Sequence, residues 1–151
     1  MKPGFTLVEL MTVLVIIALM SSAVVLTLPG NKTTTLTFAE AMTRELNAVS
    51  QNGMISGHPT AVGLSEDGYA LLAFENGNWV EHRGSEWPEG VIVQFDRSEQ
   101  RIELGEDIIP LVVFNPTGSS TVFRLGLRDF TDDINIESDG DGRVKMVARY
   151  E

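Results

Sequence analysis

The feature that most constrains this chain is an uncharged apolar run near its N-terminus. No charged residue occurs between Leu10 and Leu28. As a helix, this run would span roughly 28 Å at about 1.5 Å per residue, which is close to the hydrocarbon thickness of a bilayer. Its middle part, residues 14–20 (LVIIALM), has no polar face, so an amphipathic surface helix is excluded. The run therefore predicts a helix surrounded by lipid or by other apolar helices.

Three other interpretations of the run have to be weighed. A buried core helix would need a larger domain around it than the rest of the chain provides. A plain membrane anchor fits the length. A cleaved secretory signal fits Ser21–Ala23, which is a small-x-small cleavage site, with Lys2 as a minimal positive region. Cleavage after Ala23 would leave a periplasmic binding module.

Glu9 distinguishes between these interpretations. A carboxylate in an apolar helix costs on the order of 2.5–3.5 kcal/mol at the bilayer centre and less toward the interface. A signal peptide or a plain anchor has no need of it. If the chain is cut after Gly4, however, Phe5 carries a new α-amino group close to Glu9. The two charges can then neutralise each other, within one subunit or between neighbours.

Residues 4–10 (GFTLVEL) resemble the N-terminal signature of type IV pilins and type II secretion pseudopilins. That signature is a short basic leader ending in Gly, then Phe, three apolar or small residues, Glu and a long hydrophobic stretch. The resemblance implies that a prepilin peptidase cleaves after Gly4 and methylates Phe5, and that Glu9 guides each subunit into a helical filament. The leader departs mildly from the pattern, because Pro3 stands where a basic residue often precedes the Gly and Lys2 is its only cation.

A second helix is expected after the apolar run. Residues 29–35 (PGNKTTT) begin with a Pro-Gly pair that ends or kinks the first helix, and they continue as a poor helix former that predicts a hinge. Thr37 and Glu40 match a capping box, which predicts a helix start at Phe38, and Gly53 predicts its end. One apolar stripe at spacings of three and four indicates that this helix lies on a sheet; it comprises Leu36, Ala39, Met42, Leu46 and Val49.

Beyond residue 58 the apolar period changes to two, which predicts antiparallel β structure. Asn76-Gly77 is a strong hairpin signal. About nine short strands in this length suggest two packed sheets with the helix on one face. We expect strands at Thr60–Leu64, Tyr69–Phe74, Trp79–Arg83, Val91–Asp96, Arg101–Leu104, Leu111–Phe114, Phe123–Arg128, Ile134–Glu137 and Arg143–Tyr150.

The predicted fold class is therefore α+β, with a long N-terminal hydrophobic helix of the type IV pilin kind followed by an antiparallel β domain of two packed sheets. The predicted organisation is a leader at residues 1–4, a transmembrane or filament-core helix at 5–29, a hinge and amphipathic helix at 30–57, and a periplasmic β domain at 58–151.

The charge distribution argues against nucleic acid as a partner. The first 29 residues contain only Lys2 and Glu9 as charged residues, so the whole net charge of −10 lies in the rest of the chain. Such a domain repels phosphate backbones. Arg143, Lys145 and Arg149 nevertheless form a local basic face, which is either an ordinary solvated strand or a surface that binds a partner.

Several site chemistries find no support in the sequence. The absence of cysteine excludes disulfides, thiol nucleophiles and thiolate metal sites. Asp139–Gly142 with Glu137 looks superficially like a calcium loop, but the full spacing and the terminal Glu are missing, so a hairpin turn is expected. His58 and His82 have no ligand spacing. No nucleophile elbow or phosphate-binding glycine loop occurs. We expect no enzyme activity, no metal and no cofactor, and core or interface roles for the aromatic residues Trp79, Trp87, Phe95 and Phe123.

A second motif narrows the family. Residues 114–118 (FNPTG), followed by residues 123–125 (FRL), resemble the F-x-P-x-G…F-x-L pattern of the GspH/FimT pseudopilin domain, and residues 134–146 resemble the end of that domain. With the N-terminal signature, the resemblance covers essentially the whole chain. It implies minor pseudopilin H of the type II secretion system, a structural subunit of the pseudopilus needed for protein export across the outer membrane. The alternative in the same domain family is a minor pilin of a type IV pilus, in assembly or DNA uptake.

The resemblance also implies location and partners. The chain would be a single-pass inner-membrane protein with its C-terminal domain in the periplasm, and it would then join the periplasmic pseudopilus. Its implied partners are the major pseudopilin, the other minor pseudopilins of the tip complex, the prepilin peptidase, the inner-membrane assembly platform, and membrane lipid before assembly.

Overall fold

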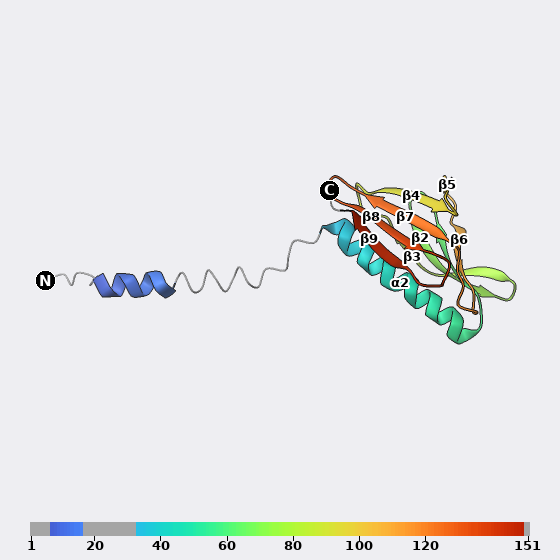
Figure 1. Cartoon of the computed structure of the whole chain (residues 1–151), viewed down its shortest axis with the longest axis horizontal. Coiled ribbons are helices and arrows are strands. Elements are labelled where there is room, and N and C mark those ends of the chain that lie inside the picture. Colours follow the sequence, from blue (N-terminus) through green and yellow to red (C-terminus); the bar gives the residue numbers. More distant parts are fainter. Residues whose placement is uncertain (1–6, 17–32, 150–151) are drawn as a thin grey trace. The chain divides into compact units, whose positions relative to one another are not determined.

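The computed structural model describes residues 7–16 and 33–149 (Figure 1). The chain separates into two units, Met1–Lys32 and Thr33–Glu151. In the first unit, residues 7–16 form a helix, here called the N-terminal helix. In the second, the described residues form helix α2 followed by nine strands, β1–β9. The leader, most of the apolar run and the Pro-Gly pair at residues 29–30 lie outside the described residues.

Helix α2 spans Thr34–Ser56 and begins earlier than the capping-box prediction, which was wrong in placing the start at Phe38. Its N-cap is Thr33, whose backbone is extended (φ −63°, ψ 156°) and whose side chain accepts a hydrogen bond from the N–H of Leu36 at 3.3 Å. The threonines that make this segment a poor helix former by propensity are stabilised by partners from a distant loop, which no local pattern reveals.

The end of α2 also differs from the prediction, because the helix passes through Gly53 and continues to Ser56. Gly57 is the left-handed C-cap (φ 71°), and its N–H donates to the carbonyl of Gly53 at 3.0 Å. Gly53 is buried, and a Cβ there would lie 3.0 Å from Oγ1 of Thr60. Gly53 therefore serves close packing of the helix on the first strand instead of ending the helix.

One antiparallel sheet has four strands in the order β3-β2-β1-β6. The predicted hairpin at Asn76-Gly77 is confirmed: both residues have positive φ (50° and 85°), and Glu75 pairs with Asn78 across the turn. Strand β1 lies in the interior of this sheet and is buried along its whole length. The strand bounds are Thr60–Leu64 for β1, Gly68–Glu75 for β2, Asn78–Glu86 for β3 and Ile109–Phe114 for β6.

The second antiparallel sheet has five strands in the order β5-β4-β7-β8-β9. Burial alternates along β7 and β8 as the sequence period predicts. Strand β9 begins at Lys145, since the backbone of Val144 is bound by α2 instead of by β8. The strand bounds are Ile92–Arg97 for β4, Gln100–Ile102 for β5, Phe123–Arg128 for β7, Asp133–Ser138 for β8 and Lys145–Arg149 for β9.

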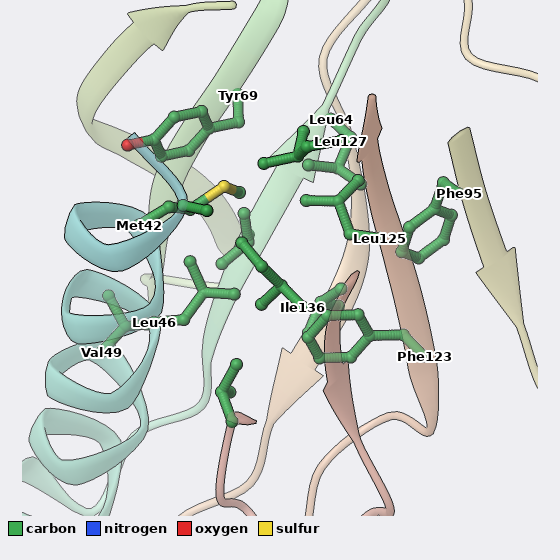
Figure 2. Packing of buried hydrophobic residues seen from close by; sticks show 14 of the residues in the cluster. Met42, Leu46, Val49, Leu64, Tyr69, Phe95, Phe123, Leu125, Leu127 and Ile136 are labelled. Atoms are coloured by element: carbon green, nitrogen blue, oxygen red, sulfur yellow. The ribbon is translucent and has the colours of Figure 1, made fainter. Parts of the chain in front are cut away.

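The core lies where α2 meets both sheets. The helix contacts β1 and β6 of one sheet and β7, β8 and β9 of the other, and Figure 1 shows it running alongside β9, the edge strand of the five-stranded sheet. In Figure 2, Met42, Leu46 and Val49 of α2 lie on the side of the helix that faces the β7 and β8 side chains Leu125 and Ile136. The predicted apolar stripe is thus the buried face of the helix, and the α+β class with two antiparallel sheets is confirmed.

The aromatic residues that the sequence singled out belong to packed clusters. Phe95 and Phe123 are buried and stack with ring centroids 6.2 Å apart. Trp87 packs with Tyr69, centroid to centroid 5.5 Å, and its indole N–H donates to the carbonyl of Ser65 at 3.0 Å. On the β2–β3 hairpin, Trp79 packs against Phe74 at 5.1 Å.

Candidate functional site

The N-terminal helix carries Glu9 among apolar side chains. All of the side chains at residues 7–16 are exposed within the chain, and Glu9 is the carboxylate of this stretch. Thr12 of this helix bonds back, its hydroxyl donating to the carbonyl of Val8 at 2.9 Å. A helix with apolar side chains on every face has no side suited to water, so it requires lipid or other helices as its surroundings.

The predicted processing site is not part of the described structure. Gly4 and Phe5 lie in residues 1–6, which are outside the described residues. Ala23 of the alternative cleavage site lies in residues 17–32, which are also outside them. Among the residues that are described, no helix has both the length and the apolar character needed to cross a membrane.

In the second unit, the start of α2 is fastened to the loop between β7 and β8. The hydroxyl of Thr33 donates to Oδ2 of Asp132, and the hydroxyl of Thr35 donates to Oδ2 of Asp129. The first turn of α2 contains no acidic residue of its own. The two loop carboxylates therefore supply the negative charge that a helix N-terminus favours.

Asp129 also organises its own loop. Its Oδ1 accepts hydrogen bonds from the N–H groups of Thr131 at 2.6 Å and Asp132 at 2.7 Å. The hydroxyl of Thr35, followed by these two N–H groups, holds the pKa of Asp129 below its ordinary value. The carboxylate is thus favoured in its charged form at the helix start.

The middle of α2 is tied to the four-stranded sheet by a polar triad. Tyr69 donates its hydroxyl to Glu45 at 2.8 Å, and the guanidinium of Arg83 lies 3.2 Å from the other carboxylate oxygen of Glu45. Burial, followed by the hydrogen bond and the charge of Glu45, raises the pKa of Tyr69 well above its ordinary value. Tyr69 therefore stays a neutral donor, which fits a packing role.

The two C-terminal motif segments meet beside the second half of α2. Gly142 packs so tightly on the 114–118 loop that a Cβ would lie 2.4 Å from the carbonyl oxygen of Gly118. The hydroxyl of Ser50 donates to the carbonyl of Gly142 at 2.7 Å. Ser120, just after the first segment, donates its N–H to the carbonyl of Gly140 at 3.0 Å. The glycines of both segments thus serve close backbone approach, not ligand binding.

Asn47 continues this attachment with two hydrogen bonds to one residue. Its amide nitrogen donates to the carbonyl of Val144 at 2.9 Å, and its amide oxygen accepts from the N–H of Val144 at 3.0 Å. The side chain therefore pairs with the chain just before β9 in the way a neighbouring strand would.

Comparisons with known proteins found matches for the N-terminal segment and for the second unit. The family model for the prokaryotic N-terminal methylation motif matches residues 2–25. No curated protein matches the chain by sequence.

Two solved structures share the architecture of the second unit, one of them a minor pseudopilin. EpsH from the type 2 secretion system of Vibrio cholerae superimposes with a TM-score of 0.65 at 17% identity, covering 79% of this chain and 100% of that chain. The solution structure of Escherichia coli GspH gives a TM-score of 0.58 at 15% identity, covering 73% and 84%. The chain has the minor pseudopilin fold.

Within this pseudopilin fold, the loop considered for calcium is occupied by protein contacts. Asp139 is exposed and its carboxylate lies 3.3 Å from the ammonium of Lys145. Asp141 accepts the N–H of Arg143 at 2.9 Å, which is a local turn interaction. No group of three or more potential metal ligands occurs in the described part of the chain.

The two histidines lie on different elements of the pseudopilin fold. His58 is in the connection between α2 and β1, whereas His82 lies on β3, where its Nε2 is 2.9 Å from Glu75. Neither belongs to a group of three or more potential metal ligands in the described part of the chain.

The local basic face is interleaved with acids. On the five-stranded sheet, Arg124 lies 3.2 Å from Glu137, and Arg128 lies 2.8 Å from Asp133. Lys145 pairs with Asp139 as described above, and the side chain of Arg149 lies outside the described residues. Of the predicted basic face, Lys145 is thus paired with an acid, while the pairs of Arg124 and Arg128 lie on β7 and β8. Exposed pairs of this kind are typical of a solvated sheet surface.

The sequence did not single out the loop that holds the start of α2. Its residues 129–132 (DFTD) combine carboxylates with Phe130, and the run of threonines at residues 33–35 is the complementary signal. Neither stretch indicates its partner, because the pairing joins positions 94 and 99 residues apart.

Proposed function

We propose that this chain is a structural, non-enzymatic minor pseudopilin of a type II secretion pseudopilus. The observation that carries the proposal is the presence, in one chain, of the N-terminal methylation motif and a domain with the fold of EpsH and GspH. The chain is made as a prepilin in the inner membrane, with its domain in the periplasm, and it then joins the filament.

The proposed mechanism is assembly through the processed N-terminus. The prepilin peptidase cuts after Gly4 and methylates Phe5. The apolar helix then leaves the bilayer and packs against the corresponding helices of other subunits, which cover its exposed side chains. In that apolar surrounding, Glu9 pairs with the Phe5 amine of a neighbour and sets the register, because two charges that are costly singly neutralise each other.

The proposed partners follow from this route. Membrane lipid surrounds the helix before assembly, and the prepilin peptidase and the inner-membrane assembly platform act on it there. In the filament, the major pseudopilin and the other minor pseudopilins of the tip complex surround it.

Processing is tested by the intact mass of protein extracted from membranes. Loss of residues 1–4 together with the gain of one methyl group is expected. Loss of the chain through Ala23 would instead identify a secreted periplasmic module, and retention of residues 1–4 would contradict the mechanism.

Assembly is tested with Glu9→Ala in a strain that lacks the native gene. We expect loss of crosslinking to the major pseudopilin and loss of exoprotein secretion, with the β domain still folded by circular dichroism. Thr12→Ala is the matched control in the same helix, since its hydroxyl bonds only to Val8 of its own helix; it should assemble normally. Normal secretion by Glu9→Ala would refute the mechanism.

A type IV pilus minor pilin for DNA uptake remains the alternative. A gel shift of the second unit with duplex DNA at low and high salt separates the two: the acidic charge predicts no shift, and tight salt-dependent binding would favour the uptake pilin.

A further inference from the structure

Phe130 is an apolar side chain that the folded domain does not use. It lies in the loop between β7 and β8, and its relative exposure is 108%, so its whole ring is offered to the surroundings. The other phenylalanines of the second unit pack against the core or against a neighbouring ring. A fully exposed aromatic ring carries a large apolar area that a contact beyond its own domain can bury.

The loop around Phe130 is firmly built. Asp129 accepts the N–H groups of Thr131 and Asp132, and its own N–H donates to the carbonyl of Asp132 at 3.0 Å. Asp129 and Asp132 are in turn bound by the threonine hydroxyls at the start of α2. The ring is therefore presented by a loop that is fixed on both sides, next to the residue at which the chain enters the domain.

Covalent geometry limits the distance between this entry point and the end of the apolar run. Between Leu28, where the run ends, and Thr33, where α2 is capped, the chain can span at most about 18 Å. While the run lies in a bilayer, the start of α2 is thus held close to the membrane surface. Phe130 is attached to that same end of the domain.

The carboxylates in and next to this loop are bound by protein groups. Asp129 and Asp132 bind the start of α2, and Asp133 lies 2.8 Å from the guanidinium of Arg128. Ile92, which pairs in register with Arg128, is a second exposed apolar side chain at this end of the sheet (60% exposed). What the loop presents outward is accordingly its aromatic ring.

We propose that Phe130 inserts into the headgroup region of the bilayer that holds the subunit's own apolar run, and so orients the domain on the membrane before assembly. Aromatic rings are favoured at this depth, where an apolar body meets a wet boundary. The inference rests on the proposed function to the extent that residues 10–28 must lie in a membrane.

The experiment compares two tryptophan substitutions in the full chain. Phe130→Trp and Ile55→Trp are each reconstituted into phosphatidylcholine vesicles whose acyl chains carry bromine close to the headgroup. Ile55 is the matched control, because it is also highly exposed (85%) but lies at the other end of α2, a helix of 23 residues and about 33 Å. The emission of wild type, which contains Trp79 and Trp87, is subtracted from both.

We expect the tryptophan at position 130 to lose about half of its emission in brominated vesicles and to shift to shorter wavelength, while the tryptophan at position 55 is unchanged. Equal quenching at both positions, or quenching at neither, overturns the proposal. A shift at position 130 that depends on protein concentration and not on lipid also overturns it, because a second copy would then cover the ring.

Flotation of the same samples with the vesicles separates membrane binding of the whole chain from insertion of Phe130. If wild type does not float, the membrane step of the proposed function fails and this inference fails with it. If it floats without selective quenching at position 130, only the inference fails. Phe130→Ser should melt at the wild-type temperature, and a lowered melting temperature would show that the ring stabilises the domain instead.

Discussion

The two helices of this protein use similar apolar residues for different purposes. In the N-terminal helix, apolar side chains stand next to each other on all faces and are exposed, as Leu7 (80%) and Leu14 (58%) illustrate. In α2 they recur at every third or fourth position, and Leu46 is 1% exposed. The difference teaches that spacing, and not apolar content, separates a helix that stabilises its own domain from one that must find its surroundings in other molecules.

The comparison is tested most strongly by making the same substitution in both helices. Leu46→Ala should lower the free energy of unfolding of the domain by about 2–5 kcal/mol, because it opens a cavity between α2 and the sheets. Leu14→Ala should leave it unchanged. Denaturant unfolding of the full chain in detergent measures both. A similar loss from both variants would show that the N-terminal helix also packs on the domain.

A glycine substitution tests how closely the two backbone segments beside α2 are packed. Gly142→Ala should cost about 1–3 kcal/mol, because the new Cβ would meet the carbonyl of Gly118 at 2.4 Å in addition to the strain of a positive φ. Gly77→Ala has a similar φ (85°) but nothing within 4 Å of the new Cβ. Thermal unfolding of the two variants isolates the contact, and equal losses would mean that φ alone matters.

A smaller loss of stability is expected when Asn47, which binds the residue just before β9, is replaced. Asn47→Ala removes both hydrogen bonds to Val144 and should cost about 1–2 kcal/mol. Asn52→Ala makes the same chemical change at an exposed position of the same helix and should be nearly neutral. Hydrogen exchange of the Val144 amide should rise in the first variant only; protection that persists there would refute the role of Asn47.

The smallest effect is expected at the helix start and depends on pH. Thr35→Val removes the hydroxyl that lowers the pKa of Asp129 and should cost about 1 kcal/mol at neutral pH. A lowered native pKa gives stability that is complete above the ordinary carboxyl pKa and is lost as the pH falls through the lowered value.

Melting temperatures between about pH 7 and about pH 3 should therefore converge for wild type and Thr35→Val as the pH falls. Thr34→Val, at the exposed neighbouring position, should keep the pH dependence of wild type. A gap that stays constant across this range would show that Asp129 is not the partner that matters.

Much of the domain could be predicted because its signals are local. Alternation predicted the bounds of β1 and β7 as observed, and Asn76-Gly77 predicted its hairpin. The start of α2 could not be predicted, since Thr33 and Thr35 find their partners far along the chain. Gly53 was misjudged for a similar reason: its small size serves a contact with Thr60 that only the packed helix reveals.

The candidate site divides in the same way. Gly4, Phe5 and Glu9 belong to a short linear signature that needs no tertiary context, so the sequence identifies them, and their roles stay predictions. Phe130 carries no such signature, because its exposure follows from the loop that holds it.

The contacts of α2 also decide when this domain can fold. The helix precedes all nine strands in the chain, and its buried stripe contacts β1 and β6 as well as β7, β8 and β9, which are synthesised last. The part of the stripe that packs on the five-stranded sheet therefore stays uncovered until β7, β8 and β9 have been synthesised. An intermediate that lacks these three strands therefore exposes apolar side chains of α2 that the complete domain buries.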